Sequence, residues 1–298
     1  MRSATYRLTE PSTPRLFDVI CAGEALWNLT ALRGAFSMRS SALRLRPGGG
    51  AANAALALAQ QGFRVGLATT LTDDSFGRTV RDRLAAAGVD TGGVSLVPQR
   101  LGLVLVTGEP SASKGVPTRE EDHAFAVPAG WSSRILLLSG LSPGIAQGAS
   151  LCKAARAARR RGTPVLVDLN ARYHLWTGRD PRAIRSLLAE ADVVRCSAED
   201  LAVLRLDEAT VRSAMRARAV LVMSRRSGEA WAKGPFGEVR HAPRDVSPLR
   251  PPGAGDVFTA AICAELTRRG DLAEGREDRW AQTLQRGQAA VLALGSAR

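Results

Sequence analysis

The sequence predicts an α/β fold in which a mostly parallel sheet is covered by helices. Short apolar runs rich in β-branched residues alternate along the chain with segments of helical periodicity. Parallel strands need long crossover connections, and helices of this length supply them. A hydrophobic content of 45% and a charged content of 23% are typical of a globular protein. Because 298 residues can bury a large core, we expect 1–298 to form a single domain.

Each element follows from its own pattern. Short apolar runs of the kind found in buried strands predict strands at 18–22, 65–70, 135–139, 165–168, 193–196 and 220–224. Helical periodicity predicts helices at 51–61, 76–87, 145–161, 181–189, 198–204, 208–217, 254–268 and 279–294. Residues 229–233 and 238–242 flank a Gly-Pro-Phe-Gly turn and predict a hairpin. Two segments, 27–46 and 94–127, interrupt the alternation, and insertions this long in a compact domain are typically functional or disordered.

The net charge of +13 raises the question of a nucleic-acid partner. Only Lys114, Lys153 and Lys233 are lysines, so nearly all of the basic residues are arginine. Aromatic residues make up 5% of the chain and do not alternate with the arginines as a base-stacking surface requires. We therefore attribute the charge to composition, spread over solvated surfaces, and expect no nucleic-acid partner.

The sequence offers no membrane or export signal. Residues 1–15 are polar and lack the apolar core of a signal peptide, and no apolar run reaches membrane-spanning length. The four cysteines are far apart and form no CxxC pair, which favours reduced thiols. We expect a cytoplasmic protein with no membrane partner.

A glycine turn opens a helix near the C-terminus, where 252–260 read PGAGDVFTA. Free N–H groups at a helix N-terminus bind phosphate, and glycines let the backbone approach an anion closely. Asp256 lies in the first helical turn, where a carboxylate repels a phosphate unless it has a task such as taking a proton from a hydroxyl. The alternative is that Asp256 only complements the helix dipole.

A second glycine cluster, PGGGAANAA at 47–55, leads into another helix. Three glycines bring backbone close to a small ligand, and the amide of Asn53 suits a hydroxyl because it both donates and accepts. The alternative is a tightly packed helix start without a ligand. Other site types are excluded by the sequence: no lysine precedes Ser or Thr as a P-loop requires, and the three histidines are isolated from one another and from cysteine.

Together, the two clusters resemble the ribokinase-like, or PfkB, family of carbohydrate kinases. In that family an early GG-x-x-x-N-x-A segment binds the sugar, and a late GAGD segment carries the catalytic aspartate. The resemblance implies a ribokinase-like parallel-sheet core with a small β lid, formed here by the insertions at 27–46 and 94–127. It also implies ATP and Mg²⁺ as cofactors, and a homodimer that can form through the lid.

The resemblance assigns the catalytic residues. Asp256 would be the general base, in a turn formed with Gly253, Ala254 and Gly255, whose N–H groups would make the anion hole. The segment DLNAR at 168–172, with a following LW, is similar to D-P-N-x-R…LW of the fructokinase and ketodeoxygluconate kinase branch. The alternative for that segment is an ordinary strand-end turn with a surface arginine. The substrate-binding residues implied by the resemblance are Asn28, Gly49, Gly50, Asn53, Asn170 and Arg172.

The nucleotide side departs from the family pattern. The segment MSRRSG at 223–228 matches a T-L-G-x-x-G turn, with Arg225 in place of a glycine, and Arg250-Pro251-Pro252 replaces D-T-T before GAGD. The nucleotide-binding residues implied are Ser224, Arg225, Gly228 and Arg250. Asp200 occupies the place of the acid that organises Mg²⁺ through waters, although the same segment reads equally as a helix N-cap at Ser197 with an acidic first turn.

The function that these features favour is ATP-dependent phosphorylation of a hydroxyl on a sugar or sugar-like molecule. The alternative is a nucleotide- or sugar-binding protein that has lost phosphoryl transfer and acts through interactions, which the substitutions at Arg225 and Arg250 suggest. The segment around Asn170 and Arg172 favours ketoses or keto-sugar acids, and nucleosides stay open. The sequence does not fix the substrate or the oligomeric state.

Overall fold

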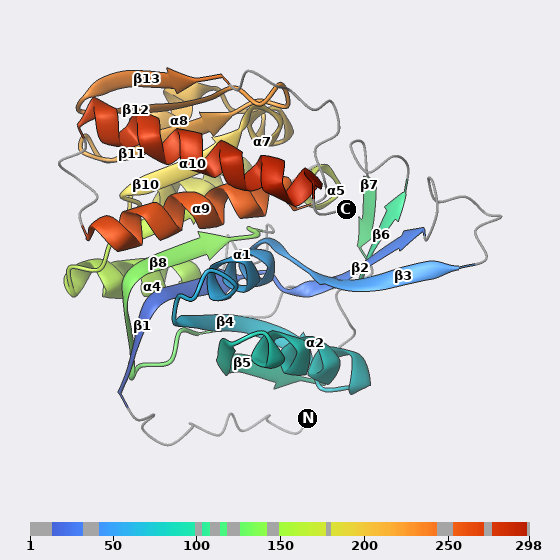
Figure 1. The fold of residues 1–298 in the computed structure, drawn as a ribbon. Helices are drawn as coiled ribbons and strands as arrows, with labels where there is room; N and C mark the ends of the chain where they lie inside the picture. Colours follow the sequence, from blue (N-terminus) through green and yellow to red (C-terminus); the bar gives the residue numbers. More distant parts are fainter. Residues whose placement is uncertain are drawn as a thin grey trace.

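The computed structural model describes residues 14–31, 42–98, 103–107, 114–117, 126–141, 149–176, 180–242, 253–270 and 276–296. A nine-stranded sheet runs through the centre of the molecule in the order β13-β12-β11-β10-β9-β8-β1-β4-β5 (Figure 1). Its strands are β1 (Arg15–Gly23), β4 (Val65–Thr72), β5 (Val89–Val97), β8 (Trp131–Ser139), β9 (Val165–Asp168), β10 (Val193–Ser197), β11 (Val220–Ser224), β12 (Ala230–Gly234) and β13 (Gly237–His241).

Neighbouring strands from β11 to β5 pair in parallel, whereas β12 and β13 form an antiparallel hairpin at one edge. Strands β4 and β9 are buried at every position, as expected of parallel strands that are covered on both faces. This architecture confirms the predicted fold class.

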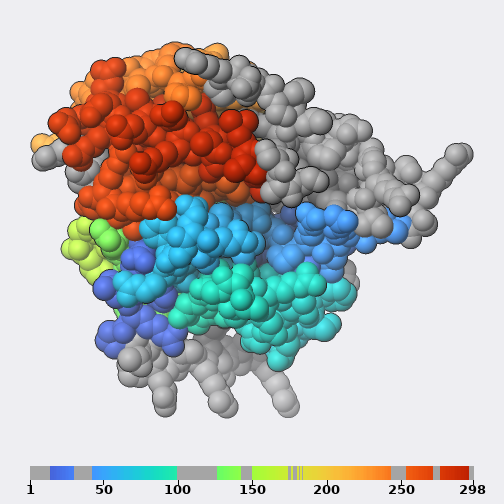
Figure 2. All heavy atoms as spheres, viewed as in Figure 1, coloured from blue at the N-terminus to red at the C-terminus, as the bar shows by residue number. Residues whose placement is uncertain are grey.

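Helices cover both faces of the sheet. One face carries α1 (Gly50–Ala59), α2 (Ser75–Ala86), α9 (Ala254–Arg269) and α10 (Glu277–Ser296). The other carries α4 (Ala149–Arg160), α5 (Tyr173–Trp176), the 3-10 turn η2 (Pro181–Ile184), α6 (Arg185–Leu188), α7 (Ala198–Leu204) and α8 (Glu208–Ala214). In the space-filling view, the red and orange α10 and α9 and the blue and teal α1 and α2 form one continuous surface (Figure 2).

A smaller sheet lies beside the core, to the right in Figure 1, and has the order β3-β2-β6-β7. Its strands are β2 (Leu26–Ala31), β3 (Leu43–Gly48), β6 (Leu103–Thr107) and β7 (Lys114–Pro117). They come from the two segments that interrupt the alternation in the sequence. The second interruption starts later than we expected, because β5 continues to Val97, whose partner in the main sheet is Thr72 of β4.

The expected elements of the core are present, with differences at their ends. The predicted helix at 181–189 divides into η2 and the short α6, and the helix predicted at 208–217 ends at Ala214. The strand over Val89–Val97 is absent from our predictions because its Asp-Thr-Gly-Gly centre lacks a continuous apolar run. Within the part of the chain that the structure describes, no helix combines the length and apolarity needed to cross a membrane.

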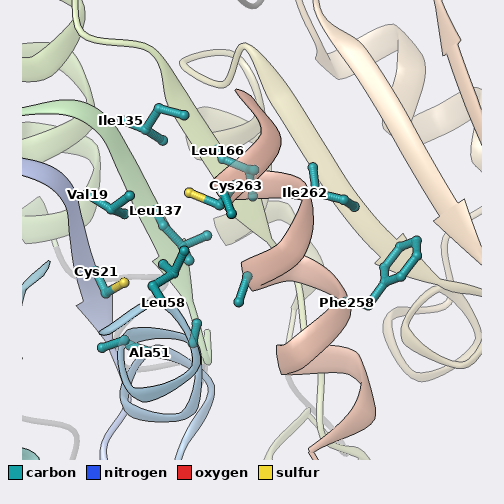
Figure 3. Packing of buried hydrophobic residues seen from close by; sticks show 14 of the residues in the cluster. Val19, Cys21, Ala51, Leu58, Ile135, Leu137, Leu166, Phe258, Ile262 and Cys263 are labelled. Carbon is teal, nitrogen blue, oxygen red and sulfur yellow. The ribbon is translucent and has the colours of Figure 1, made fainter. Parts of the chain in front are cut away.

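Helices α1 and α9 pack directly on each other over the sheet. Ala51 and Leu58 of α1 and Cys263 of α9 lie in one apolar cluster with side chains of β1 and β8 (Figure 3). Small alanine side chains along α1 allow close approach of the two helices, and α1 buries Ala51 and Ala55 completely. This packing brings the glycine-rich start of α1 to the N-terminus of α9.

Candidate active site

Five neighbouring strands end at the same edge of the sheet, which is where ligands of parallel sheets bind. Register fixes their last residues side by side: Gly23 pairs with Ser139, and Ser139 pairs with Asp168. Ser197 of β10 pairs with Ser224 of β11 in the same way. The edge is therefore lined by short polar side chains, and the N-terminus of α9 meets it, since Thr259 donates a 2.9 Å hydrogen bond to Asp168.

The N-terminal turn of α9 is built to leave its amides open. Gly253 is the N-cap and has a left-handed φ of 86°, which glycine adopts without steric cost. No side chain caps this end of the helix in the described chain, and the first internal bond is Val257 N–H to Gly253 O at 2.9 Å. The first N–H groups of a helix have no intrahelical acceptor. The turn containing Ala254, Gly255 and Asp256 therefore offers donors to an anion.

The carboxylate of Asp256 is buried, with an exposed fraction of 3%. Asn53 of α1 donates to Oδ2 at 2.7 Å, and Asn170, just after β9, donates to Oδ1 at 2.8 Å. Burial raises the pKa of Asp256, and Arg172 and the Asn53 hydrogen bond oppose that rise. The two asparagines thus orient a carboxylate that burial has made more basic than usual.

The glycine-rich start of α1 leaves room for these side chains. A Cβ on Gly50 would lie 2.5 Å from Asn170 Nδ2 and 2.5 Å from Ser139 Oγ, so only glycine fits there. Gly49 has a φ of 95°, and a Cβ on it would lie 2.4 Å from the carbonyl oxygen of Glu24. Asn170 itself has a φ of 40°, in the left-handed region that asparagine tolerates better than most residues. Both predicted substrate segments therefore converge on Asp256.

The remaining predicted substrate residues lie around this centre. Asn28 is on β2 of the smaller sheet, directly opposite Arg46 of β3. A Cβ on Gly48 would lie 2.1 Å from Asn28 Nδ2, so the asparagine packs over the glycine turn that leads into α1. Arg172 is exposed and is close enough to Asp256 to lower its pKa. The structure thus groups Asn28, Arg172 and Asp256 around the start of α1.

The predicted nucleotide residues are engaged with protein groups. Ser224 is buried and accepts a 3.1 Å hydrogen bond from Arg195 Nη2. The guanidinium of Arg225 pairs with Glu229 at 3.0 Å and lies 5.0 Å from the ring centroid of Trp231. Gly228 has a φ of 93°, and its carbonyl accepts a bond from Gln288 of α10. Arg250, with Pro251 and Pro252, lies outside the described residues.

Asp200 forms a capping box at the start of α7. Oδ2 of Asp200 accepts hydrogen bonds from Ser197, from its backbone N–H at 2.6 Å and from the Ser197 hydroxyl at 2.8 Å. Oδ1 of Asp200 accepts a 2.7 Å bond from the N–H of Ala171. The carboxylate is 4% exposed and also lies 3.8 Å from Arg195. This set of donors does not fit direct coordination of magnesium, because the oxygens already serve the backbone and a cation; the contact through waters that the resemblance implies stays a prediction. Among the described residues there is no cluster of three or more His, Cys, Asp or Glu that could hold a metal.

A buried polar cluster behind Asp256 is absent from our sequence predictions. Asp168 at the end of β9 is fully buried and accepts bonds from Arg195 at 3.1 Å and Ser139 at 3.2 Å, as well as the one from Thr259. Burial raises the pKa of Asp168 to about 6, although Arg195 opposes the rise. The sequence did carry a signal: an arginine interrupts the apolar run of β10, VVRCS, and a charge in a buried strand requires a partner.

Comparison with known proteins identifies the family. The sequence profile of the pfkB family carbohydrate kinases matches residues 17–290. A fructokinase of Klebsiella pneumoniae is 31% identical over 75% of this chain and 78% of its own length. A 5-dehydro-2-deoxygluconokinase of Shouchella clausii (strain KSM-K16) is 27% identical over 86% of this chain and 85% of its own length.

The fold comparison agrees. The structure of a Xylella fastidiosa fructokinase with bound ATP has a TM-score of 0.77 and 25% identity, covering 92% of this chain and 91% of that chain. The predicted ribokinase-like fold and the predicted fructokinase and ketodeoxygluconate kinase branch are therefore confirmed. Both curated relatives are named as kinases, which supports an enzyme over a protein that only binds ligands. The chain belongs to the PfkB family of carbohydrate kinases.

Proposed function

We propose that this kinase transfers the γ-phosphoryl group of ATP to a hydroxyl of a sugar or sugar-like molecule, with Asp256 as the general base. The observation that carries the proposal is the place of Asp256: it lies in the first turn of α9, buried, with one asparagine amide on each carboxylate oxygen. A carboxylate fixed beside a helix N-terminus can accept the proton of a hydroxyl while the helix amides hold the phosphate.

The step balances without a further reactant. The hydroxyl oxygen forms a bond to the γ-phosphorus, the bond from that phosphorus to the β–γ bridging oxygen breaks, and ADP leaves. The hydroxyl proton passes to the carboxylate of Asp256. Because Asn53 and Asn170 donate to separate oxygens, they hold the carboxylate in one orientation while each oxygen keeps capacity for another bond.

The anion hole would be formed by the N–H groups of Ala254, Gly255 and Asp256, with Gly253 shaping the turn. Donors fixed in this way stabilise charge that develops on the phosphoryl oxygens, and losing one donor of such a hole typically costs ~10²–10³-fold in rate. Arg172 is exposed beside this centre, and its planar guanidinium suits the charge of a moving phosphoryl group.

The sugar would be bound between the smaller sheet and the start of α1. Asn28 on β2 and the turn of Gly49 and Gly50 would border its hydroxyls. Asn53 and Asn170 would act both on the sugar and on Asp256, to which they already donate. The smaller sheet would then act as a lid that excludes water from the transfer.

The nucleotide would lie near the turn that follows β11. On that side would lie Ser224, Arg225, Gly228 and Arg250. At Arg225 the backbone of the turn would contact the nucleotide, because the side chain is held by Glu229 and Trp231. ATP is bound in the structure of a related fructokinase, and a neighbour of the same fold, a putative ribokinase from E. coli, binds ATP with Mg²⁺. When bound, Mg²⁺ neutralises phosphate charge.

The relatives favour a substrate class. Fructokinase and 5-dehydro-2-deoxygluconokinase relatives favour a ketose or a keto-sugar acid over a nucleoside. We also propose one domain over 1–298 with a lid from the two insertions, a homodimer that pairs through the lid, a cytoplasmic location, and no nucleic-acid or membrane partner.

The test is ADP release by the purified protein with Mg-ATP across a panel of sugars, sugar acids and nucleosides. Asp256→Asn keeps the shape of the side chain and removes the base, so we expect sugar-dependent ADP release to fall by ~10²–10⁴-fold while ATP binding stays nearly unchanged. Asp82→Asn, on the exposed face of α2, is the matched control and should keep wild-type rates.

Two outcomes would contradict the proposal. Near-normal turnover by Asp256→Asn would refute the base assignment. An absence of ADP from every member of the panel, in protein that ATP still stabilises against heat, would favour the alternative of a binding protein that has lost phosphoryl transfer.

A further inference from the structure

Arg195 lies on β10 in the interior of the protein, directly behind the proposed anion hole. Its exposed fraction is 4%, and among the described residues it is the one arginine that is buried. It is the partner of Asp168 in the register of β10 and β9. Burying a guanidinium in a sheet costs free energy unless carboxylates and acceptors surround it, so its position calls for an explanation.

The guanidinium of Arg195, which lies on β10, contacts three other elements of the active-site edge. Nη1 donates to Asp168 at 3.1 Å, and Nη2 donates to Ser224 at 3.1 Å. The first turn of α9 lies on top of it, because a Cβ on Gly255 would be 3.5 Å from both Nη1 and Nη2. One turn further along α9, the ring of Phe258 is 5.8 Å from Cζ. Arg195 therefore joins β9, β10 and β11 to the turn that carries Asp256.

Its bonding is not that of a fully saturated ion pair. Nε has no hydrogen-bond partner in the described chain although it is buried. Asp200 lies 3.8 Å away and is already used by the backbone of α7. An unpaired buried donor is costly, so the ion pair of Arg195 is not arranged for stability alone.

The charges around Arg195 are unequal. Three buried carboxylates, Asp168, Asp200 and Asp256, lie in this cluster with one buried guanidinium. The other cation that acts on Asp256 is Arg172, which is exposed and therefore screened by solvent. The thiol of Cys196 adjoins Arg195 on β10, and burial raises its pKa, so it adds no negative charge near neutral pH.

Resting on the proposed function, we propose that Arg195 is a positioning residue for phosphoryl transfer: it holds the first turn of α9 against the strand ends and supplies the buried positive charge that allows Asp256 to be ionised beside Asp168. The guanidinium of Arg195 lies behind Gly255. It therefore acts on the reaction through the first turn of α9 and through the buried carboxylates. Asp168 is its counter-ion, and Ser139 and Thr259 fix that counter-ion in place.

The experiment compares Arg195→Met with Arg195→Lys, with Asp168→Asn and with the double variant Arg195→Met/Asp168→Asn. Each is assayed for kcat and kcat/KM as a function of pH in the ADP-release assay. Removing the cation should raise the pKa of Asp256 and so move the acid limb of the pH–rate profile to higher pH, by about one pH unit. The double variant restores the charge balance and should return the limb toward the wild-type position. Arg195→Lys keeps the charge, and its acid limb should lie between those of wild type and Arg195→Met.

Arg269→Met is the matched control. Arg269 lies at the other end of α9 and binds Glu265 at 3.1 Å, so its loss should weaken the fold and leave the acid limb in place. If Arg195→Met lowers stability without moving the limb, as the control does, Arg195 has only a structural role and the proposal is overturned. It is also overturned if the double variant shows the same displaced limb as Arg195→Met.

A readout without catalysis separates this proposal from the proposed function. Urea unfolding as a function of pH reports the buried carboxylates in each variant. The free energy of unfolding of Arg195→Met should fall more steeply with rising pH than that of wild type. In the double variant this additional fall should be absent. A wild-type protein that releases no ADP with any sugar would refute the proposed function, while the unfolding series would still support or refute the charge balance around Arg195.

Discussion

The two ends of helix α9 hold buried carboxylates in opposite electrostatic settings. At the C-terminal end, Glu265 is 1% exposed and binds Arg268, Arg269 and Arg286. Those arginines reach in from the surface, with side chains that are 49%, 18% and 59% exposed. At the N-terminal end the ratio of carboxylates to arginines is reversed, because three buried carboxylates share one buried arginine.

The difference shows how the same helix can combine a rigid attachment with a reactive carboxylate. The carboxylate of Glu265, which binds several arginines, ties α9 to α10 through Arg286. Burial raises the pKa of both Asp256 and Asp168, and for Asp168 the neighbouring carboxylates of Asp200 and Asp256 add to the rise. The N-terminal end of α9, and not its C-terminal end, therefore carries the carboxylates that are suited to accept a proton.

The largest effect that would test this contrast is the pH dependence of stability. The pKa of Asp168 is about 6 in the folded protein and near 3.8 when the group is unperturbed, so the folded state favours its neutral form. The resulting stabilisation is complete below about pH 4 and is lost as pH rises through 6, on the order of 3 kcal/mol in total. Urea unfolding of wild type and Asp168→Asn across this range measures it.

In Asp168→Asn the part of the slope due to this carboxylate should vanish, so the stability difference between the two proteins should change with pH between about 4 and 7. A constant difference across that range would mean that the buried N-terminal cluster does not raise the pKa of Asp168.

A smaller effect is expected at the other end of the helix. Glu265→Gln keeps the shape of the side chain but removes the charge that binds three arginines, so we expect a loss of about 2 kcal/mol in the free energy of unfolding. Its kcat should stay near the wild-type value, in contrast to Asp256→Asn. A large fall in kcat without a fall in stability would show that the C-terminal end also takes part in the reaction.

The smallest effect concerns Arg225, at the turn after β11. Arg225→Ala removes an exposed ion pair with Glu229 and a contact with Trp231, which should cost less than about 1 kcal/mol. If the guanidinium is held there by these partners, the KM for ATP should change little. A rise of about tenfold in that KM, equivalent to 1.4 kcal/mol, would place the side chain on the nucleotide instead.

The sequence predicted the elements whose periodicity is unbroken. The strands at 65–70, 165–168, 193–196 and 220–224 and the helices at 51–61, 198–204 and 254–268 were located to within two residues because their apolar spacing is regular. Strands β1 and β8 begin at Arg15 and Trp131, three and four residues before the predicted starts at 18 and 135. Strand β5 was missed because two glycines and two polar residues interrupt its run, and among the described strands it pairs with β4 alone. The lid was predicted as a small β unit formed by the two insertions, but the pairing of its strands was not predicted, since that pairing is set between segments far apart in the chain.

By itself, the sequence determined the fold class, the family and the turn that carries Asp256, because local periodicity and two glycine motifs encode them. Tertiary structure alone decided that Asn53 and Asn170 bind the two oxygens of Asp256, that Asp200 serves the cap of α7, and that Arg195 lies beneath Gly255. The physical reason is that the pKa of a carboxylate depends on burial and on charges brought together from separate strands, and the linear order of residues does not contain those distances.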